Sequence, residues 1–207
     1  MSKLNPAYRN ASFMLSVASL AQLPPDEGAE VAIVGRSNAG KSSAINTITG
    51  INALARTSKT PGRTQQINFF EIAEGRRLAD LPGYGYARVP LSARQKWVKL
   101  IEDYLQTRES LKGLIIVMDC RRPLQELDIQ LLNWCCAAQM PVHLLLTKAD
   151  KLSRGGAGNA LQQVRSEVAR TFNPHEEQEI TVQLFSSLKK TGIEEAHFCL
   201  DGWLNFR

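Results

Sequence analysis

Short apolar runs alternate with longer amphipathic stretches along most of the chain. The apolar runs predict strands at residues 30–34, 66–73, 76–80, 113–119, 141–147 and 180–186. The amphipathic stretches predict helices at residues 41–49, 92–108, 125–138, 159–171 and 192–204. Strands and helices that alternate in this way indicate an α/β fold.

Two features of the pattern define the expected sheet. Only Glu74 and Gly75 separate the second and third predicted strands, so these strands should form an antiparallel hairpin. The runs at 113–119 and 141–147 are apolar throughout, as expected for parallel strands that are buried on both faces. We therefore predict a three-layer fold with a sheet of about six strands, mostly parallel with one antiparallel strand, and helices on both faces. In such sheets ligands bind beyond the carboxyl ends of the strands.

The segment before the first predicted strand is interpreted as an amphipathic lead-in. It covers residues 1–28 and is followed by a single domain at residues 29–207. Lys3 and Arg9 precede the run ASFMLSVASLA, which faintly resembles a secretory signal. Three serines interrupt this run, and it is too short to span a bilayer. We therefore expect a cytoplasmic protein with no membrane partner.

The composition is ordinary for a globular protein and adds one hint about partners. Of the 207 residues, 43% are hydrophobic and 22% are charged. The net charge of +5 suggests a polyanionic partner such as nucleic acid, although a mildly basic protein without such a partner fits equally well. The four cysteines include no CxxC pair, which indicates reduced thiols rather than a disulfide framework.

The segment GRSNAGKS follows the first predicted strand directly and precedes a predicted helix. It satisfies the P-loop pattern G-x-x-x-x-G-K-[ST], in which backbone N–H groups and the start of a helix surround phosphate oxygens. Lys41 is expected to reach the β and γ phosphates, and the Ser42 hydroxyl to bind Mg²⁺. Residues predicted to contact the nucleotide are Gly35, Arg36, Ser37, Asn38, Ala39, Gly40, Lys41, Ser42 and Ser43. The fold should therefore be that of a P-loop NTPase.

The segment DLPG ends the third predicted strand. Asp80 is the candidate for the outer coordination shell of the metal, as in other P-loop enzymes. Gly83 offers a backbone N–H that can approach the γ-phosphate because no Cβ lies in the way. Leu81 and Pro82 complete the predicted contact. The pattern D-x-x-G alone describes any strand-to-turn junction, but its position behind a P-loop favours a nucleotide site.

Two further segments at strand ends are candidates for the base site. In TKAD, which comprises Thr147, Lys148, Ala149 and Asp150, the aspartate could accept hydrogen bonds from guanine N1–H and the 2-amino group. Adenine lacks these donors, so a buried carboxylate here would select guanine. The stem of Lys148 would lie along the base. Without the P-loop, Asp150 could equally be an N-cap of the next helix. Phe185, Ser186 and Ser187 end the last predicted strand and could add a backbone N–H to guanine O6.

Taken in this order, the segments resemble the translation-factor-related class of GTPases. GRSNAGKSSAIN, KTPGRTQQINFF, DLPGYGYA, TKADKL and FSSLKKTG together resemble the EngB family, in the TrmE-Era-EngA-EngB-septin-like class of P-loop GTPases. The resemblance covers residues 30–203. It implies binding of GTP and GDP with Mg²⁺, GTP hydrolysis, and a role in assembly of the large ribosomal subunit and in normal septation.

The resemblance also implies a switch segment at residues 52–65. Thr64 would be the second Mg²⁺ ligand and would act in catalysis with Lys41 and Gly83, while Thr57 and Thr60 are rivals on chemistry alone. Nucleotide contacts are implied at Gly62, Arg63, Thr64, Gln65 and Gln66. Asn38 matches an asparagine with which related GTPases help to hold a monovalent cation such as K⁺, although it could equally cap the loop's own backbone.

Two residues depart from the common GTPase pattern. Thr147 stands where many GTPases have asparagine; its hydroxyl can still brace the P-loop but reaches less well toward guanine N7, so we expect micromolar affinity. Tyr84 follows Gly83, where Ras-like GTPases have the glutamine that orients water. A tyrosine lacks the paired donor and acceptor, so it is interpreted as a packing residue. Hydrolysis should then be slow, with K⁺, a partner or a residue from 56–63 completing the site.

We favour a GTP switch that acts on a ribosomal assembly particle over three alternatives. Basic residues in and after the switch segments could contact ribosomal RNA, or could form only a solvated face. They are Arg56, Lys59, Arg63, Arg88, Arg94, Lys96 and Lys99. One alternative is a binding module that recruits division proteins and is merely stabilised by GTP. A second is membrane-traffic signalling of the Ras type, which would be expected to show a C-a-a-X box or a myristoylation glycine. The third is a P-loop kinase or ATPase, and Asp150 argues against it. No DNA partner is expected, and nothing in the sequence requires more than a monomer.

Overall fold

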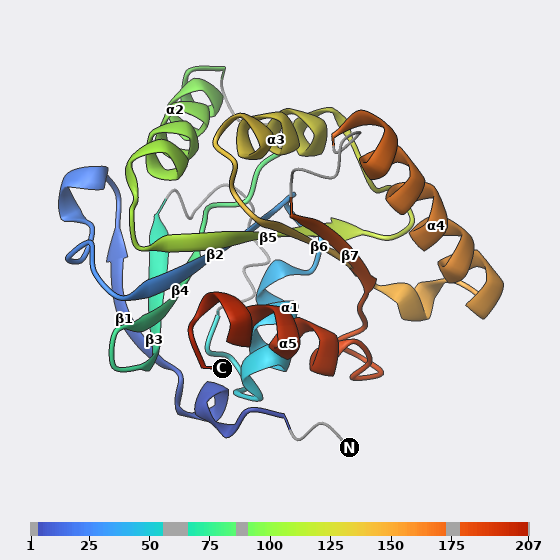
Figure 1. The fold of residues 1–207 in the computed structure, drawn as a ribbon, viewed down its shortest axis with the longest axis horizontal. Coiled ribbons are helices and arrows are strands. Elements are labelled where there is room, and N and C mark those ends of the chain that lie inside the picture. The colour runs from blue at the N-terminus through green and yellow to red at the C-terminus, as the bar shows by residue number, and fades with distance from the viewer. Residues whose placement is uncertain (1–3, 56–65, 86–90, 173–178, 207) are drawn as a thin grey trace.

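The computed structural model describes residues 4–55, 66–85, 91–172 and 179–206, and within them seven strands form one sheet. The strands are β1 (Ser12–Val17), β2 (Ala29–Gly35), β3 (Ile67–Ala73), β4 (Arg76–Asp80), β5 (Leu111–Asp119), β6 (Val142–Thr147) and β7 (Ile180–Leu184). Their order across the sheet is β1-β3-β4-β2-β5-β6-β7 (Figure 1). β4, β2, β5, β6 and β7 run parallel, and β3 pairs antiparallel with both β4 and β1.

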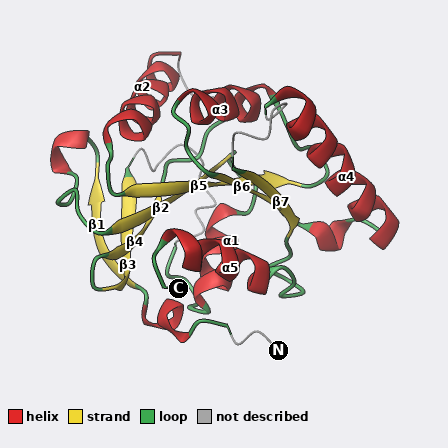
Figure 2. Cartoon of the chain, viewed as in Figure 1, coloured by secondary structure: helices red, strands yellow, loops and turns green. Residues whose placement is uncertain are grey.

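Helices cover both faces of this sheet (Figures 1 and 2). They are α1 (Lys41–Thr49), α2 (Leu91–Thr107), α3 (Glu126–Ala137), α4 (Arg154–Thr171) and α5 (Ile193–Trp203), with short 3-10 turns η1 (Pro6–Asn10), η2 (Leu20–Gln22) and η3 (Ala149–Lys151). α2, α3 and α4 lie on one face, and α1 and α5 on the other. The predicted three-layer α/β fold with one antiparallel strand is confirmed.

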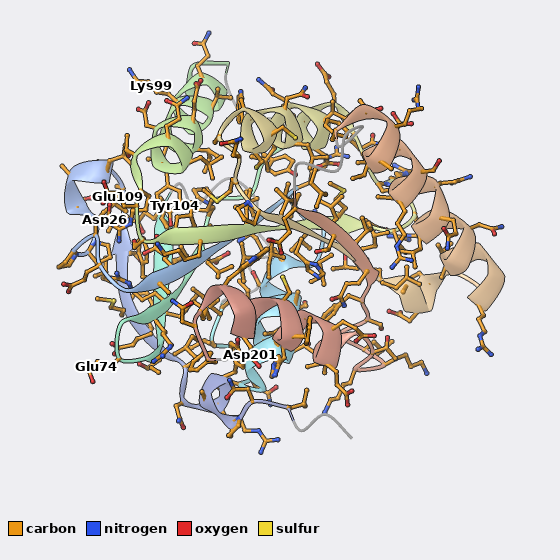
Figure 3. The ribbon with its side chains drawn as sticks, in the orientation of Figure 1. Asp26, Glu74, Lys99, Tyr104, Glu109 and Asp201 are labelled. Atoms are coloured by element: carbon orange, nitrogen blue, oxygen red, sulfur yellow. The ribbon has the colours of Figure 1, made fainter. Side chains whose placement is uncertain are left out.

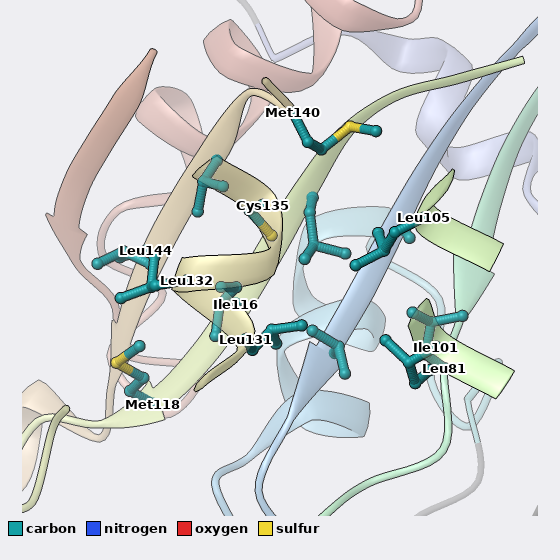
Figure 4. Packing of buried hydrophobic residues seen from close by; sticks show 14 of the residues in the cluster. Leu81, Ile101, Leu105, Ile116, Met118, Leu131, Leu132, Cys135, Met140 and Leu144 are labelled. Carbon is teal, nitrogen blue, oxygen red and sulfur yellow. The ribbon is translucent and has the colours of Figure 1, made fainter. Parts of the chain in front are cut away.

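Each face of the sheet has its own hydrophobic core. On the first, Leu131 and Leu132 of α3 point toward Ile116 of β5 and Leu144 of β6 (Figure 4). On the second, Leu200 of α5 belongs to a cluster with α1 and η1. β5 and β6 contribute side chains to both cores, which explains why their sequences are apolar throughout.

One strand was missed, and the start of one helix was predicted several residues too late. β1 was not predicted, because it is an edge strand whose exposed residues leave only Val17 fully buried, and a bulge between Phe13 and Leu15 interrupts its pairing with β3. α4 begins at Arg154 instead of residue 159. The Ser153 side chain caps it by accepting a hydrogen bond of 3.1 Å from the Gly156 N–H, and the glycine-rich stretch before residue 159 belongs to the helix.

A buried charged network closes the end of the sheet that lies opposite to the ligand-binding end. The carboxylate of Glu30 is fully buried near the start of β2, where it accepts hydrogen bonds from Arg108 at 3.0 Å and from the Tyr104 hydroxyl. Asp26 accepts a hydrogen bond of 2.9 Å from the Glu109 N–H beside this network (Figure 3). These contacts fasten the start of β2 to the end of α2, and the carboxyl ends of the strands stay available for a site. Among the described residues, no helix combines the length and the hydropathy that a membrane crossing requires.

Candidate nucleotide site

The predicted P-loop connects β2 to α1 at the carboxyl end of the sheet. Gly35 must be glycine, because a Cβ there would lie 2.6 Å from the carbonyl oxygen of Val117 on the neighbouring strand. Asn38 and Gly40 have positive φ angles of 64° and 98°. Single residues in this conformation turn successive N–H groups toward a common side, and that concave side suits an anion. α1 then starts at Lys41, so the positive end of its dipole also faces the loop.

Lys41 and Asp80, both predicted site residues, form an ion pair. Asp80 ends β4 next to Ile33 of β2, and the side chains of Lys41 and Asp80 are only 13% and 9% exposed. Ser42 lies in the first turn of α1, half-buried. A hydroxyl and a carboxylate are oxygen donors that fit Mg²⁺, which commonly takes one or two protein ligands and completes its shell with phosphate oxygens and water.

The turn after β4 lies against the start of the P-loop. A Cβ on Gly83 would lie 3.3 Å from the Gly35 carbonyl oxygen, so the glycine allows this close approach. The Tyr84 N–H donates to the Gly35 carbonyl at 3.2 Å, and the Ser37 N–H donates to the Tyr84 carbonyl at 2.8 Å. The turn and the P-loop are therefore held together by both backbone groups of Tyr84, the residue that follows Gly83.

The side chain of Tyr84 points into the protein and is 3% exposed. Its hydroxyl donates a hydrogen bond of 2.6 Å to Asp128 in the first turn of α3. Burial, together with the Asp128 carboxylate, raises the pKa of Tyr84 well above its ordinary value. The interpretation of Tyr84 as a packing residue is confirmed, and its hydroxyl is already used.

Thr147 braces the P-loop, as predicted. Its hydroxyl donates to the carbonyl of Ala39 and also lies 3.0 Å from the carbonyl oxygen of Met118. The side chain is buried at the end of β6. A hydroxyl at this position therefore joins the P-loop to the neighbouring strands β5 and β6.

Lys148 crosses from the end of β6 to the P-loop. Its backbone has a φ of 58°, and its Nζ donates to the Asn38 carbonyl at 2.6 Å. The same Nζ lies 3.0 Å from Asp119, and Asp119 also accepts two hydrogen bonds from Arg121, at 2.9 and 2.6 Å. The hydrogen bonds from Arg121 hold the pKa of the Asp119 carboxyl well below its usual range. Asp119 and Arg121 were not predicted as site residues, although Asp119 ends the adjacent strand β5 and its position was a usable signal.

Asp150 is a nearly buried carboxylate beside the end of β7. Its side chain is 6% exposed and accepts a hydrogen bond of 2.6 Å from the Ser186 hydroxyl. The Ala149 N–H donates to the Phe185 carbonyl at 3.2 Å, and Ser187 follows half-buried. Asp150 lies in η3, and Ser153 caps α4, so the alternative reading of Asp150 as an N-cap is wrong.

Of the remaining predicted contacts, some lie in the described part of the chain and some do not. Ser43 is half-buried in the first turn of α1, and Gln66 is exposed just before β3. Gly62, Arg63, Thr64 and Gln65, with the rivals Thr57 and Thr60, lie outside the described residues. Described residues from four strand ends therefore form one candidate site: the predicted phosphate-binding loop, an acidic group beside its lysine, and a nearly buried carboxylate at the position predicted to read the base.

This fold and this site define a P-loop GTPase. The sequence model of the family described as "50S ribosome-binding GTPase" matches residues 30–148. A relative from Azoarcus sp. (strain BH72) named "Probable GTP-binding protein EngB" is 55% identical over 96% of this chain and 93% of its own length. A protein of the same name from Coxiella burnetii (strain RSA 493 / Nine Mile phase I) is 51% identical over 97% of this chain and 96% of its own. The chain belongs to the EngB family of GTP-binding proteins and is a GTPase.

Solved structures agree with the fold. A crystal structure named as that of a probable GTP-binding protein EngB superposes with a TM-score of 0.68 at 21% identity, over 86% of this chain and 100% of that one. A crystal structure of Era in complex with MgGDPNP and nucleotides 1506-1542 of 16S ribosomal RNA has a TM-score of 0.63 at 21% identity, over 86% of this chain and 57% of that one. At these identities the likeness concerns the fold alone.

Proposed function

We propose that this chain is a Mg²⁺-dependent GTP switch with slow intrinsic hydrolysis that acts in large ribosomal subunit assembly and is needed for normal cell division. The observation that carries the proposal is the match of residues 30–148 to a family described as ribosome-binding. The presence of ribosomal RNA in the Era crystal supports a particle that contains RNA as partner. In this proposal residues 29–207 form the GTPase unit, which works as a cytoplasmic monomer with no DNA or membrane partner.

Guanine is selected by Asp150 in this proposal. A carboxylate that is almost fully buried needs partners, and the Ser186 hydroxyl at 2.6 Å supplies one. Guanine N1–H and the 2-amino group would supply two more, whereas adenine would leave the charge unpaired. Lys148, fixed over Asn38 and Asp119, would cover the base with its stem.

The phosphates are assigned to the P-loop and to Lys41. The Lys41 ammonium, paired with Asp80 in this structure, would turn to the β and γ phosphates when a nucleotide is bound. Ser42 and Asp80 would hold Mg²⁺, which neutralises charge on the phosphates. Thr64 as a further ligand and a monovalent cation beside Asn38 stay predictions.

Hydrolysis in this site depends on charge stabilisation. A water oxygen attacks the γ phosphorus, the bond to the β–γ bridging oxygen breaks, and GDP and inorganic phosphate leave. Lys41 and the Gly83 N–H would stabilise the negative charge of the transition state. The Tyr84 hydroxyl is engaged with Asp128, so it does not orient the water. Slow turnover fits a switch that holds its GTP state until a partner completes the site.

Co-sedimentation with purified ribosomal particles tests the proposal. The full chain is incubated with large-subunit particles in a non-hydrolysable GTP analogue and in GDP, with Asp150→Asn as control. The wild type should sediment with particles only in the GTP analogue. Asp150→Asn should need the corresponding xanthosine analogue, which ties sedimentation to nucleotide in this site. Equal or absent sedimentation in both states would contradict the proposal and favour the alternative, a GTP-stabilised module that recruits division proteins.

A further inference from the structure

A cavity of about 520 Å³ lies beside the P-loop, on the side of the β5–α3 connection. Arg36, Asp119, Arg121, Arg122, Asp128 and Lys148 line it together with the outer part of the P-loop. Lys41, Ser42 and Asp150 are not among the described lining residues, whereas Lys148 and the P-loop residues 36–39 are, so the cavity adjoins the candidate nucleotide site and shares part of its wall. Its volume is in the range of small-ligand pockets, which is roughly 300–1,000 Å³.

Both carboxylates of the cavity are already used inside the chain. Asp119 accepts from Arg121 at 2.6 Å and from Lys148 at 3.0 Å. Asp128 accepts from the Tyr84 hydroxyl at 2.6 Å and from the Gln125 N–H at 2.8 Å. Neither carboxylate therefore determines what the cavity attracts.

The cavity presents arginine guanidinium groups to a ligand. Arg121 uses its Nε and one Nη for Asp119, and its side chain stays 48% exposed, so N–H groups remain for a ligand. Arg122 is exposed and Arg36 half-buried. Four cationic side chains and two carboxylates leave the lining with a net positive charge. Guanidinium groups bind phosphate through two parallel hydrogen bonds, so the chemistry of the cavity fits a phosphate.

We propose that this cavity binds a phosphodiester of an RNA strand while a guanine nucleotide occupies the P-loop. The inference rests on the proposed function, because a particle that contains RNA is the partner that brings such phosphates. Three arginines around a space of nucleotide size fit a strand of RNA, and the chain's net charge of +5 supports an anionic partner.

The bound RNA would be linked through the arginines to two parts of the candidate nucleotide site. Arg121 holds Asp119, and Asp119 holds Lys148 over the P-loop. Arg36 forms a backbone bridge with Tyr84 in the turn that follows Asp80. A phosphate that engages these arginines is therefore linked to the base-covering lysine and to the switch turn, so RNA binding and nucleotide state should affect each other.

The test measures binding of a fluorescently labelled single-stranded RNA oligonucleotide to the full chain loaded with Mg²⁺ and GDP. Arg122→Gln removes a cavity guanidinium that no predicted nucleotide contact uses. It should weaken RNA binding by about tenfold and lower the dependence of log affinity on log salt by about 1. The matched control is Arg170→Gln, an exposed arginine of α4 paired with Glu167 at 2.7 Å, which should bind RNA like the wild type. GDP affinity should stay the same in both variants.

Three results would overturn the inference. Arg122→Gln could bind RNA as tightly as the wild type, excess GDP could displace the RNA, or adenosine monophosphate could bind the cavity while RNA does not. The outcome is distinguishable from that of the proposed function. GTP-dependent sedimentation with particles, combined with RNA binding that is unchanged in Arg122→Gln, would contradict the proposed RNA site in the cavity but would support the proposed GTP switch.

Discussion

The Tyr84 hydroxyl donates a 2.6 Å hydrogen bond to Asp128 and so joins the turn after β4 to the start of α3. Asp128 uses its other oxygen to accept from the Gln125 N–H at 2.8 Å and thereby completes the capping box of α3. A tyrosine at the position that follows Gly83 is therefore a structural link. The switch turn, the P-loop and α3 are fastened to one another through it.

Tyr84→Phe tests this assignment because it removes only the hydroxyl. The buried Asp128 carboxylate would lose a donor, so the free energy of unfolding should fall by about 1–3 kcal/mol. Intrinsic GTP hydrolysis at saturating GTP should stay within about twofold of the wild type, since the hydroxyl does not contact the water. Chemical denaturation and single-turnover hydrolysis measure the two effects. A large loss of hydrolysis with unchanged stability would make Tyr84 a catalytic residue instead.

The titration of Asp128 gives a second, independent measurement of the same bond. Burial raises the pKa of Asp128, and the hydrogen bond from Tyr84 works against this rise. In Tyr84→Phe the pKa should therefore rise further, which carbon-detected NMR of the carboxyl group can follow. A carboxyl whose pKa is raised by folding costs stability as the pH rises through that pKa. The destabilisation by Tyr84→Phe should therefore be greater at pH 7 than in acid, and equal effects at both pH values would contradict the bond.

The pair of Asp119 and Lys148 should determine how long a nucleotide stays bound. Asp119→Asn removes the charge that holds the Lys148 Nζ, so the Lys148 stem should be held less firmly over the base. GDP release should therefore accelerate by about three- to tenfold, which stopped-flow fluorescence of labelled GDP measures. Glu167→Gln is the matched control, because Glu167 pairs with an arginine in the same way on the distant surface of α4.

The pH dependence of this effect follows from the direction of the Asp119 pKa. Arg121 lowers that pKa, so the stabilisation by ionised Asp119 is present above the ordinary pKa and is lost only as the pH falls toward the lowered value. Asp119 should therefore stay ionised between about pH 6 and pH 8, and its titration should not change the rate of GDP release from the wild type in this range. A release rate in Asp119→Asn equal to that of the wild type would show that Lys148 needs no such partner.

Two glycines test the packing that supports the site. A Cβ on Gly113 of β5 would lie 2.5 Å from the ring of Trp203, so Gly113→Ala should displace the end of α5 and destabilise the fold by about 1–3 kcal/mol. Gly158, inside α4, has nothing within 4 Å of a built Cβ, and Gly158→Ala should stabilise by about 0.5–1 kcal/mol. Thermal denaturation of both variants checks the opposite signs. A stabilising Gly113→Ala would mean that Trp203 repacks freely.

The sequence predicted those features whose signal lies within one short stretch of the chain, and it missed those that depend on contacts between distant residues. α1 was predicted at residues 41–49, where the structure has it, because glycines, lysine and apolar periodicity all lie in one stretch. β1 escaped because an edge strand can leave its side chains exposed. The bond of Tyr84 with Asp128 spans 44 residues, and only the fold brings the two together. The pair of Asp119 and Lys148 was missed for the same reason, although Asp119 ends β5 and Lys148 directly follows β6.

Asp150→Asn tests the claim on which the guanine assignment depends. An asparagine presents an N–H₂ group to a base that offers donors, so GTP affinity should fall by about 100-fold or more. Xanthine carries a carbonyl where guanine has the 2-amino group, so XTP should bind this variant better than GTP does. Competition between the two nucleotides against labelled GDP measures the switch. Ser186→Ala is the control: it removes the 2.6 Å donor to Asp150 but leaves the carboxylate, so affinity should drop without a change of preference. An unchanged preference for GTP in Asp150→Asn would remove Asp150 from the base site.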